Sequence, residues 1–296
     1  MSLGTTLEAD PALSSRAPAT GPHARHVHIA SSGRWVTINV AELWAYRGLW
    51  LFLVWRDIKA RYAQTVLAIA WAVLQPLLSM VIFTVIFGRF VRVPSEGVPY
   101  PVFSMAGLVP WAYFSAALTG ASNSLVNSTS LVTKIYFPRL VIPGAPVLAG
   151  LVDLVIAMVM LLIIMLWFGQ APHLLTPLLL LFPVLLIMMT SMGAGSWLAA
   201  LHIQYRDIKH VTGFVVQVWM YGSPIVYPLT VVPEVYRNWY ALNPMAAAIA
   251  GFRSAFLGTP GPTLTQAAIS FGSATVLLLV GLLYFRRTER VFADVA

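Results

Sequence analysis

Long apolar runs without charge constrain this chain more than any other feature. A helix needs roughly 20 apolar residues to cross the hydrocarbon core of a bilayer. Stretches of about that length lie at 63–88, 100–126, 140–168, 174–201, 211–229 and 264–285. Only 9% of the 296 residues are charged, which excludes a water-soluble fold because such domains carry roughly 25%. We therefore expect an all-α, polytopic membrane protein with six transmembrane helices, covering residues 63–285.

The segments outside these spans predict four further parts. Residues 1–38 are rich in Ser, Ala, Pro, Thr and His without an apolar core, which indicates a mobile cytoplasmic tail rather than a signal peptide. Residues 39–62 predict an amphipathic interface helix, with an apolar stripe of Leu43, Tyr46, Trp50 and Leu53. Residues 230–262 are too broken to span and predict a re-entrant or interfacial helix pair. Residues 286–296 form a cytoplasmic C-terminal tail.

The placement of lysine and arginine orients the spans. Cytoplasmic segments of membrane proteins carry an excess of these residues. With both termini inside, 14 of the 18 basic residues are cytoplasmic, and the outside holds Arg89, Arg92, Arg237 and Arg253. This topology accounts for the net charge of +8. Nucleic-acid binding is not predicted, because the basic residues are too few and too scattered for a binding stripe.

The sequence offers little catalytic chemistry. It contains neither a Gly-x-x-x-x-Gly-Lys-Ser/Thr phosphate loop nor a His-Glu-x-x-His pair, and it has no cysteine. His23, His26 and His28 lack partner ligands, so we predict no metal site. Asp153 is the only acid clearly within a span, where it is either functional or paired with a cation from the inner face. An ion-coupled carrier usually shows several such groups, so we expect the energy for transport to come from a partner.

Aromatic residues are frequent in the predicted spans. Their faces pack against the C–H faces of sugar rings, and a lane of them would let a glycan slide. The alternative is that they face lipid or form interfacial belts. The candidates for a glycan channel are Trp71, Trp111, Tyr113, Phe114, Trp219, Tyr221 and Tyr227.

Two short loops on the predicted inner side, 127–139 and 202–210, mix basic and aromatic residues. Such loops suit a docking surface, although the positive charges also serve topology alone. Motifs around them occur in order along the chain: WRDIKARY at 55–62, LAIAW at 67–71, LQP at 74–76, NSLVN at 123–127, LVTKIYFPR at 131–139, YRD at 205–207, SPIVYP at 223–228 and LNP at 242–244. Together they resemble the ABC type-2 permeases that export O-antigen, capsular or teichoic-acid chains. The resemblance covers about 42–285.

The resemblance implies a permease in the bacterial inner membrane that exports a lipid-linked polysaccharide such as the O-antigen of lipopolysaccharide. It implies a homodimer enclosing the channel, paired with two ATP-binding subunits, while external helices act as a gate. The chain itself would be no enzyme and hold no cofactor, since ATP and Mg would bind to the partner. The ATPase-coupling residues implied by the motifs are Arg56, Asp57, Lys59, Arg61, Tyr62, Lys134, Tyr136, Phe137, Pro138, Arg139, Tyr205, Arg206 and Asp207.

Two other functions remain open from the sequence. A drug or small-lipid exporter could use the same scaffold. A membrane glycosyltransferase would need carboxylates near a sugar-nucleotide site, and only Glu96 and Glu234 are placed near the spans for this.

Overall fold

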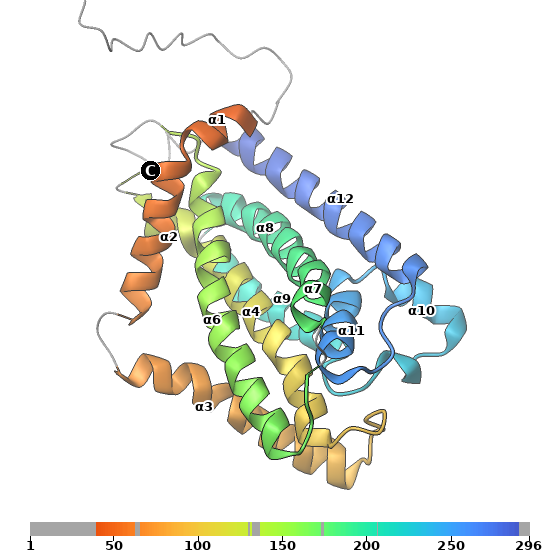
Figure 1. Ribbon diagram of the computed structural model, residues 1–296. Coiled ribbons are helices and arrows are strands. Elements are labelled where there is room, and N and C mark those ends of the chain that lie inside the picture. The colour runs from red at the N-terminus through yellow and green to blue at the C-terminus, as the bar shows by residue number, and fades with distance from the viewer. Residues whose placement is uncertain are drawn as a thin grey trace, which may run out of the picture. The chain divides into compact units, whose positions relative to one another are not determined.

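The computed structural model describes residues 40–62, 66–129, 131, 137–172, 175–205 and 207–289. These residues are predominantly helical and contain no strand, which confirms the all-α fold class (Figure 1). The predicted tail at 1–38 and residues 290–296 lie outside the described residues.

Five helical segments are long and apolar enough to cross a membrane. They match the first four predicted spans and the sixth: α3 (Val66–Phe83) continued by the π-helix η2 (Thr84–Phe90), α4 (Tyr100–Asn127), α6 (Val141–Trp167), α7 (Thr176–Leu179) with α8 (Leu181–Gln204), and α12 (Leu264–Thr288). The polytopic membrane fold is thus confirmed. The predicted span at 211–229 is instead the 14-residue α9 (Ile208–Tyr221) followed by non-helical backbone, so the count of six spans is not confirmed. Pro224 and Pro228 lack the amide donor that a longer helix would need.

The predicted interface helix is present as two helices, α1 (Val40–Ala45) and α2 (Arg47–Tyr62). Its predicted apolar stripe is the packed face, because Leu53 is buried and the rest of the stripe is partly buried in the same cluster. Leu51 and Trp55 on other faces of α2 are 65% and 64% exposed. α2 packs along α6 (Figure 1). It therefore presents apolar side chains both to α6 and away from it.

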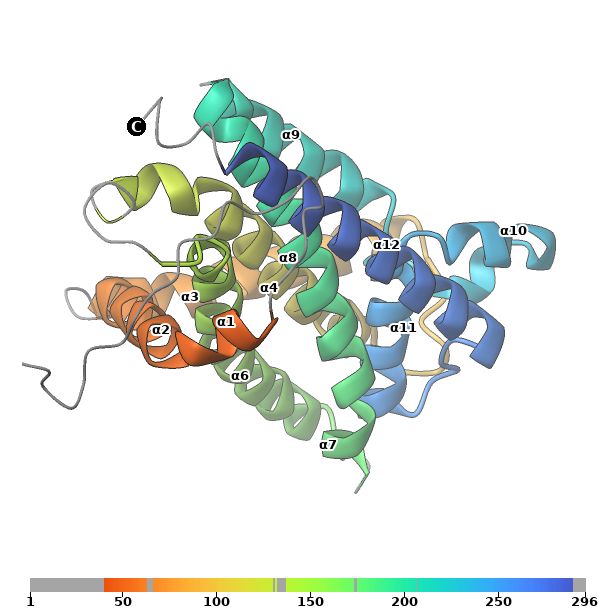
Figure 2. The same cartoon turned by 90° about the horizontal axis from the view of Figure 1, so that it is seen from above.

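α4 is the central helix of the bundle. It is buried over most of its length and packs against α3, α6, α8, α9 and α11 (Pro244–Leu257) (Figure 2). Small residues allow this close packing, since a Cβ on Gly120 would lie 2.9 Å from Pro146 of α6. Close approach through small residues is how helices associate where lipid provides no hydrophobic drive.

α8 and α12 touch through their backbones. A Cβ added to Gly281 of α12 would overlap the carbonyl group of Gly193 in α8. A Cβ added to Gly193 would in turn lie 2.6 Å from the backbone of Leu278. Both positions therefore require glycine for contact rather than for backbone conformation.

The predicted helix pair at 230–262 is observed as α10 (Glu234–Tyr240) and α11, after a short 3₁₀ turn η3 (Leu229–Val231). Asn243 caps α11 by accepting a hydrogen bond from the Met245 amide at 3.0 Å, and Gly258 ends the helix with a φ of 68°. These caps fix a helix too short to span, and α11 is buried against α4 and α8.

Replacing Gly281 by Ala should lower the stability of the purified protein by about 1–3 kcal/mol, because the added methyl group forces α8 and α12 apart. The thermal unfolding midpoint in detergent measures this loss. Gly272→Ala on the same helix is the control, since a Cβ there meets no atom within 4 Å. Equal midpoints for the two variants would contradict the backbone contact.

Candidate functional site

One end of the bundle gathers the residues flanking both predicted inner loops. Leu53 of α2, Leu125 at the end of α4, Phe137 before α6, Ala199 of α8 and Phe285 of α12 form one buried cluster. The residues next to both loops therefore lie close together, beside part of α2 and the end of α12. We call this region the loop end.

Asp153 of α6 is held by the last two residues of α2. The Arg61 guanidinium forms a salt bridge with one carboxylate oxygen, and the Tyr62 hydroxyl donates a hydrogen bond to the other. Burial and this hydrogen bond raise the pKa of Tyr62 to about 12, so the hydroxyl remains a donor at neutral pH. Of the two explanations for Asp153, the structure supports pairing with a cation, and it ties α2 to α6.

Arg56 and Asp57 lie one turn earlier on α2. The Arg56 Nη2 atom is 2.9 Å from the Asp57 carboxylate. Both residues line a cavity of about 190 Å³ between α2, α4 and α6, together with Arg61, Ser124 and Asn127. Lys59 is exposed on the same helix.

The first loop turns its described residues inward. Phe137 is 3% exposed and Pro138 is also buried, so neither side chain presents a surface to a partner in this structure. The Arg139 guanidinium donates to the backbone carbonyl of Glu289 at 2.7 Å, which links the loop to the end of α12. Lys134 and Tyr136 lie outside the described residues.

The second loop places side chains outward. Tyr205 is 60% exposed, and Asp207 at the N-cap of α9 is exposed as well. Arg206 lies outside the described residues. The accessible candidates for coupling among the described residues are therefore Arg56, Lys59, Tyr205 and Asp207.

The structure places the candidate channel aromatics in two different surroundings. Trp111, Tyr113 and Phe114 are buried inside the chain, and the Tyr113 hydroxyl donates to the Val147 carbonyl at 3.0 Å. Periodicity and apolarity alone do not distinguish such core rings from channel rings. The side chain of Trp71 is not among the described ones.

Three other candidate rings lie near the surface. Tyr221 is 69% exposed. Trp219 is partly buried against Phe114, with ring centroids 4.9 Å apart. The Tyr227 hydroxyl lies 2.8 Å from the Tyr240 hydroxyl of α10.

Arg253 is the residue that sequence reasoning missed. Its position between the fifth and sixth predicted spans places it on the outer side, and in α11 its side chain is buried with only 3% exposed. Its guanidinium donates to the carbonyls of Pro224 at 2.7 Å and Tyr227 at 3.1 Å, and also to that of Ile225. A single charge in the otherwise apolar run 244–257 was the signal of a buried role.

Arg253 also contacts α4. Its guanidinium carbon lies 3.8 Å from the centroid of the Phe103 ring, and its Nε atom donates to the Phe103 carbonyl at 3.3 Å. A Cβ on Gly107 would lie 2.5 Å from the guanidinium, so only glycine leaves room for it. Arg253 thereby joins α11, α4 and the backbone after α9.

Among the described residues, no group of three or more His, Cys, Asp or Glu side chains could hold a metal ion. The polar side chains described above form ion pairs and hydrogen bonds to carbonyl groups, and these interactions hold neighbouring helices together. At the loop end and at α11 they can transmit or resist the motion of a helix.

In this helical membrane bundle α2 packs along α6, and the residues flanking both predicted inner loops lie at one end. Such an architecture is that of a polytopic, permease-like protein. The chain belongs to the ABC-2 type transporter family, whose profile matches residues 48–257.

Two relatives of this chain are permeases that share one name. An "O-antigen export system permease protein RfbA" of Myxococcus xanthus is 33% identical over 264 residues, covering 86% of this chain and 98% of that protein. One of Klebsiella pneumoniae is 27% identical over 246 residues, covering 81% and 92%. The "Polysialic acid transport protein KpsM" of Escherichia coli is 25% identical over 245 residues, covering 81% and 92%.

Substituting Asp153 by Arg should destabilise the protein by about 1–3 kcal/mol, because it places two cations side by side at the α2–α6 junction. The double variant Arg61→Asp with Asp153→Arg restores opposite charges and should recover much of the loss. Thermal unfolding midpoints of the single and double variants measure this coupling. Independent, additive losses would show that the pair does not stabilise the junction.

Substituting Arg253 by Ala should cost about 3 kcal/mol or more, since three buried carbonyls lose their donor. The amount of folded protein recovered from membranes and its unfolding midpoint report the effect. Arg237→Ala is the matched control, because Arg237 also bonds two carbonyls but lies partly exposed. A loss at Arg253 no larger than at Arg237 would argue against the buried network.

Proposed function

We propose that this chain is the permease subunit of an ATP-driven exporter that moves a lipid-linked polysaccharide of the O-antigen type across the bacterial inner membrane. The observation that carries the proposal is the identity of 33% to an O-antigen export permease over 98% of that protein's length. The order of the motifs from 55 to 244 supports it.

A capsular glycan is the alternative substrate. Its support is the likeness to a polysialic acid transport protein, at 25% identity over 92% of that protein. Both substrates are long glycans, so the same helical scaffold suits the export of either one. The drug exporter and glycosyltransferase hypotheses draw no support from these relatives.

ATP hydrolysis belongs in this proposal to a separate ATP-binding subunit, two copies of which pair with a permease homodimer. Membership of the ABC-2 type transporter family supports such a partner. Arg56, Lys59, Tyr205 and Asp207 are its proposed contacts, because they are the exposed candidates among the described residues. Arg61, Tyr62 and Arg139 act behind them by holding α2 to α6 and the first loop to α12.

The exposed faces of α3 and α9 are the proposed sites of the homodimer and its channel. Phe214, Val218 and Tyr221 of α9 are each more than half exposed. Among the candidate aromatics, Tyr221 therefore fits contact with the glycan better than the three buried rings of α4.

The substrate assignment is tested by deleting the gene in its host. We expect lipid-linked glycan to accumulate inside the cell and to disappear from the surface, with recovery when the wild-type gene returns. Normal surface glycan in the deletion strain would refute the proposal.

The coupling assignment is tested by the double variant Tyr205→Ala with Asp207→Ala. Glycan export by the assembled transporter should fall at least about tenfold, since both changes remove accessible contacts without opening the core. Surface glycan and ATPase activity are measured on the same preparations. The control is Arg89→Ala with Phe90→Ala, which removes an exposed charge and an exposed ring at the predicted outer side. Equal export by both double variants would reject the docking role.

A further inference from the structure

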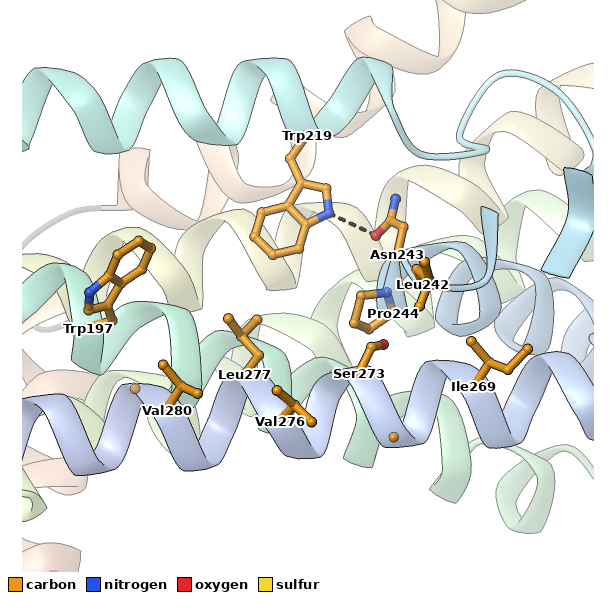
Figure 3. Close-up of a pocket in the computed structure, with 12 residues that line it drawn as sticks. Trp197, Trp219, Leu242, Asn243, Pro244, Ile269, Ser273, Val276, Leu277 and Val280 are labelled. Atoms are coloured by element: carbon orange, nitrogen blue, oxygen red, sulfur yellow. Dashed lines mark hydrogen bonds between the residues drawn. The ribbon is translucent and has the colours of Figure 1, made fainter. Parts of the chain in front are cut away.

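A long apolar groove runs between α9 and α12, with α8 as its floor (Figure 3). Its volume is about 790 Å³. Trp219 borders it from α9 and Trp197 from α8, while Val276 and Val280 line it from α12 (Figure 3). None of the predicted coupling residues lies in it, so the groove is separate from the loop-end contacts.

Most polar side chains of the groove are already engaged within the protein, and the indole N–H of Trp197 is the exception among the described lining residues. The Trp219 indole N–H donates to the Asn243 side-chain oxygen at 2.8 Å (Figure 3). The Asn243 amide donates to the Gly222 carbonyl at 2.8 Å, and the Ser273 hydroxyl to the Ser270 carbonyl at 3.0 Å. A sugar bound here would exchange its several hydrogen bonds to water for the single donor of Trp197, whereas a hydrocarbon chain would lose none. The lining therefore favours an alkyl occupant.

The groove also has the dimensions of such an occupant. It follows α12 from Ile269 to Gly281, a rise of about 18 Å at 1.5 Å per residue. One leaflet of a bilayer contributes about half of the roughly 30 Å hydrocarbon core. A single acyl chain from one leaflet therefore matches the groove in length.

The bilayer around the groove supplies such an acyl chain. α12 forms one wall of the groove and α8 contributes Trp197, and both helices are long and apolar enough to span the membrane, so the groove opens onto hydrocarbon. A second protein helix would need room for a cylinder about 10 Å wide, whereas an acyl chain is thin and adapts to an irregular wall. We propose that this groove holds one acyl chain of a bilayer phospholipid, which fills the space between α9 and α12.

Gly272 provides a direct test, because a Cβ added there meets no atom within 4 Å. Gly272→Leu should place a side chain in the groove and exclude the lipid. The variant and the wild-type chain are reconstituted in vesicles of phosphatidylethanolamine and phosphatidylglycerol, extracted in mild detergent, and weighed by native mass spectrometry. We expect the wild-type chain to retain one phospholipid more than Gly272→Leu.

Gly213→Leu is the matched control. Gly213 lies in α9 outside the groove, and a Cβ there also meets no atom within 4 Å. It should retain as many phospholipids as the wild-type chain. Should Gly272→Leu fail to accumulate, Val276→Phe fills the same groove from a position that is 61% exposed. Equal retention by the wild-type and groove-filled chains overturns the proposal.

Two other outcomes would assign the groove to a different occupant and likewise overturn the proposal. A retained mass equal to a polyprenyl lipid would point to the anchor of an exported glycan. Disulfide-linked dimers of Gly272→Cys would point to a second copy of the chain, and this readout is clean because the native sequence has no cysteine.

Discussion

Seven consecutive backbone carbonyls, from Gly222 to Pro228, lie outside any helix, and each accepts a hydrogen bond from within the chain. Buried backbone without such partners costs several kcal/mol, and lipid offers none. Arg253 donates hydrogen bonds to three of these seven carbonyls, Asn243 donates to one, and Tyr100 of α4 donates to another. The short α9, the break after it and the buried α11 therefore depend on one another, since α11 carries the guanidinium that makes the break tolerable.

A different set of contacts governs the loop end. Arg61 and Tyr62 fasten the end of α2 to Asp153 in the third membrane helix, and Arg139 fastens the first loop to the end of α12. In the proposed exporter, force from an ATP-binding subunit reaches the bundle through this ion pair and these hydrogen bonds. Asp153, the only acid clearly within a predicted span, thus has a structural partner and needs no role in ion coupling.

The sequence predicted the helical class, most span positions and the packed stripe of α2, because these follow from hydrophobic length and periodicity. It did not predict the end of α9 at Tyr221, which depends on the distant Arg253. Nor did it separate Tyr113 and Phe114, which are buried, from Tyr221, which is exposed, since all three look alike in an apolar run. Motif order located the loops, but the burial of Phe137 arises from packing among residues of α2, α4, α6, α8 and α12.

The direct contact of Gly193 with Gly281 restricts how this molecule can change shape. At this point no side chain separates the two backbones, so α8 and α12 cannot approach each other more closely. A cycle of opening and closing that keeps this contact must displace other helices around the pair. The groove leaves space between α9 and α12, while α9 itself packs against α4 and α8.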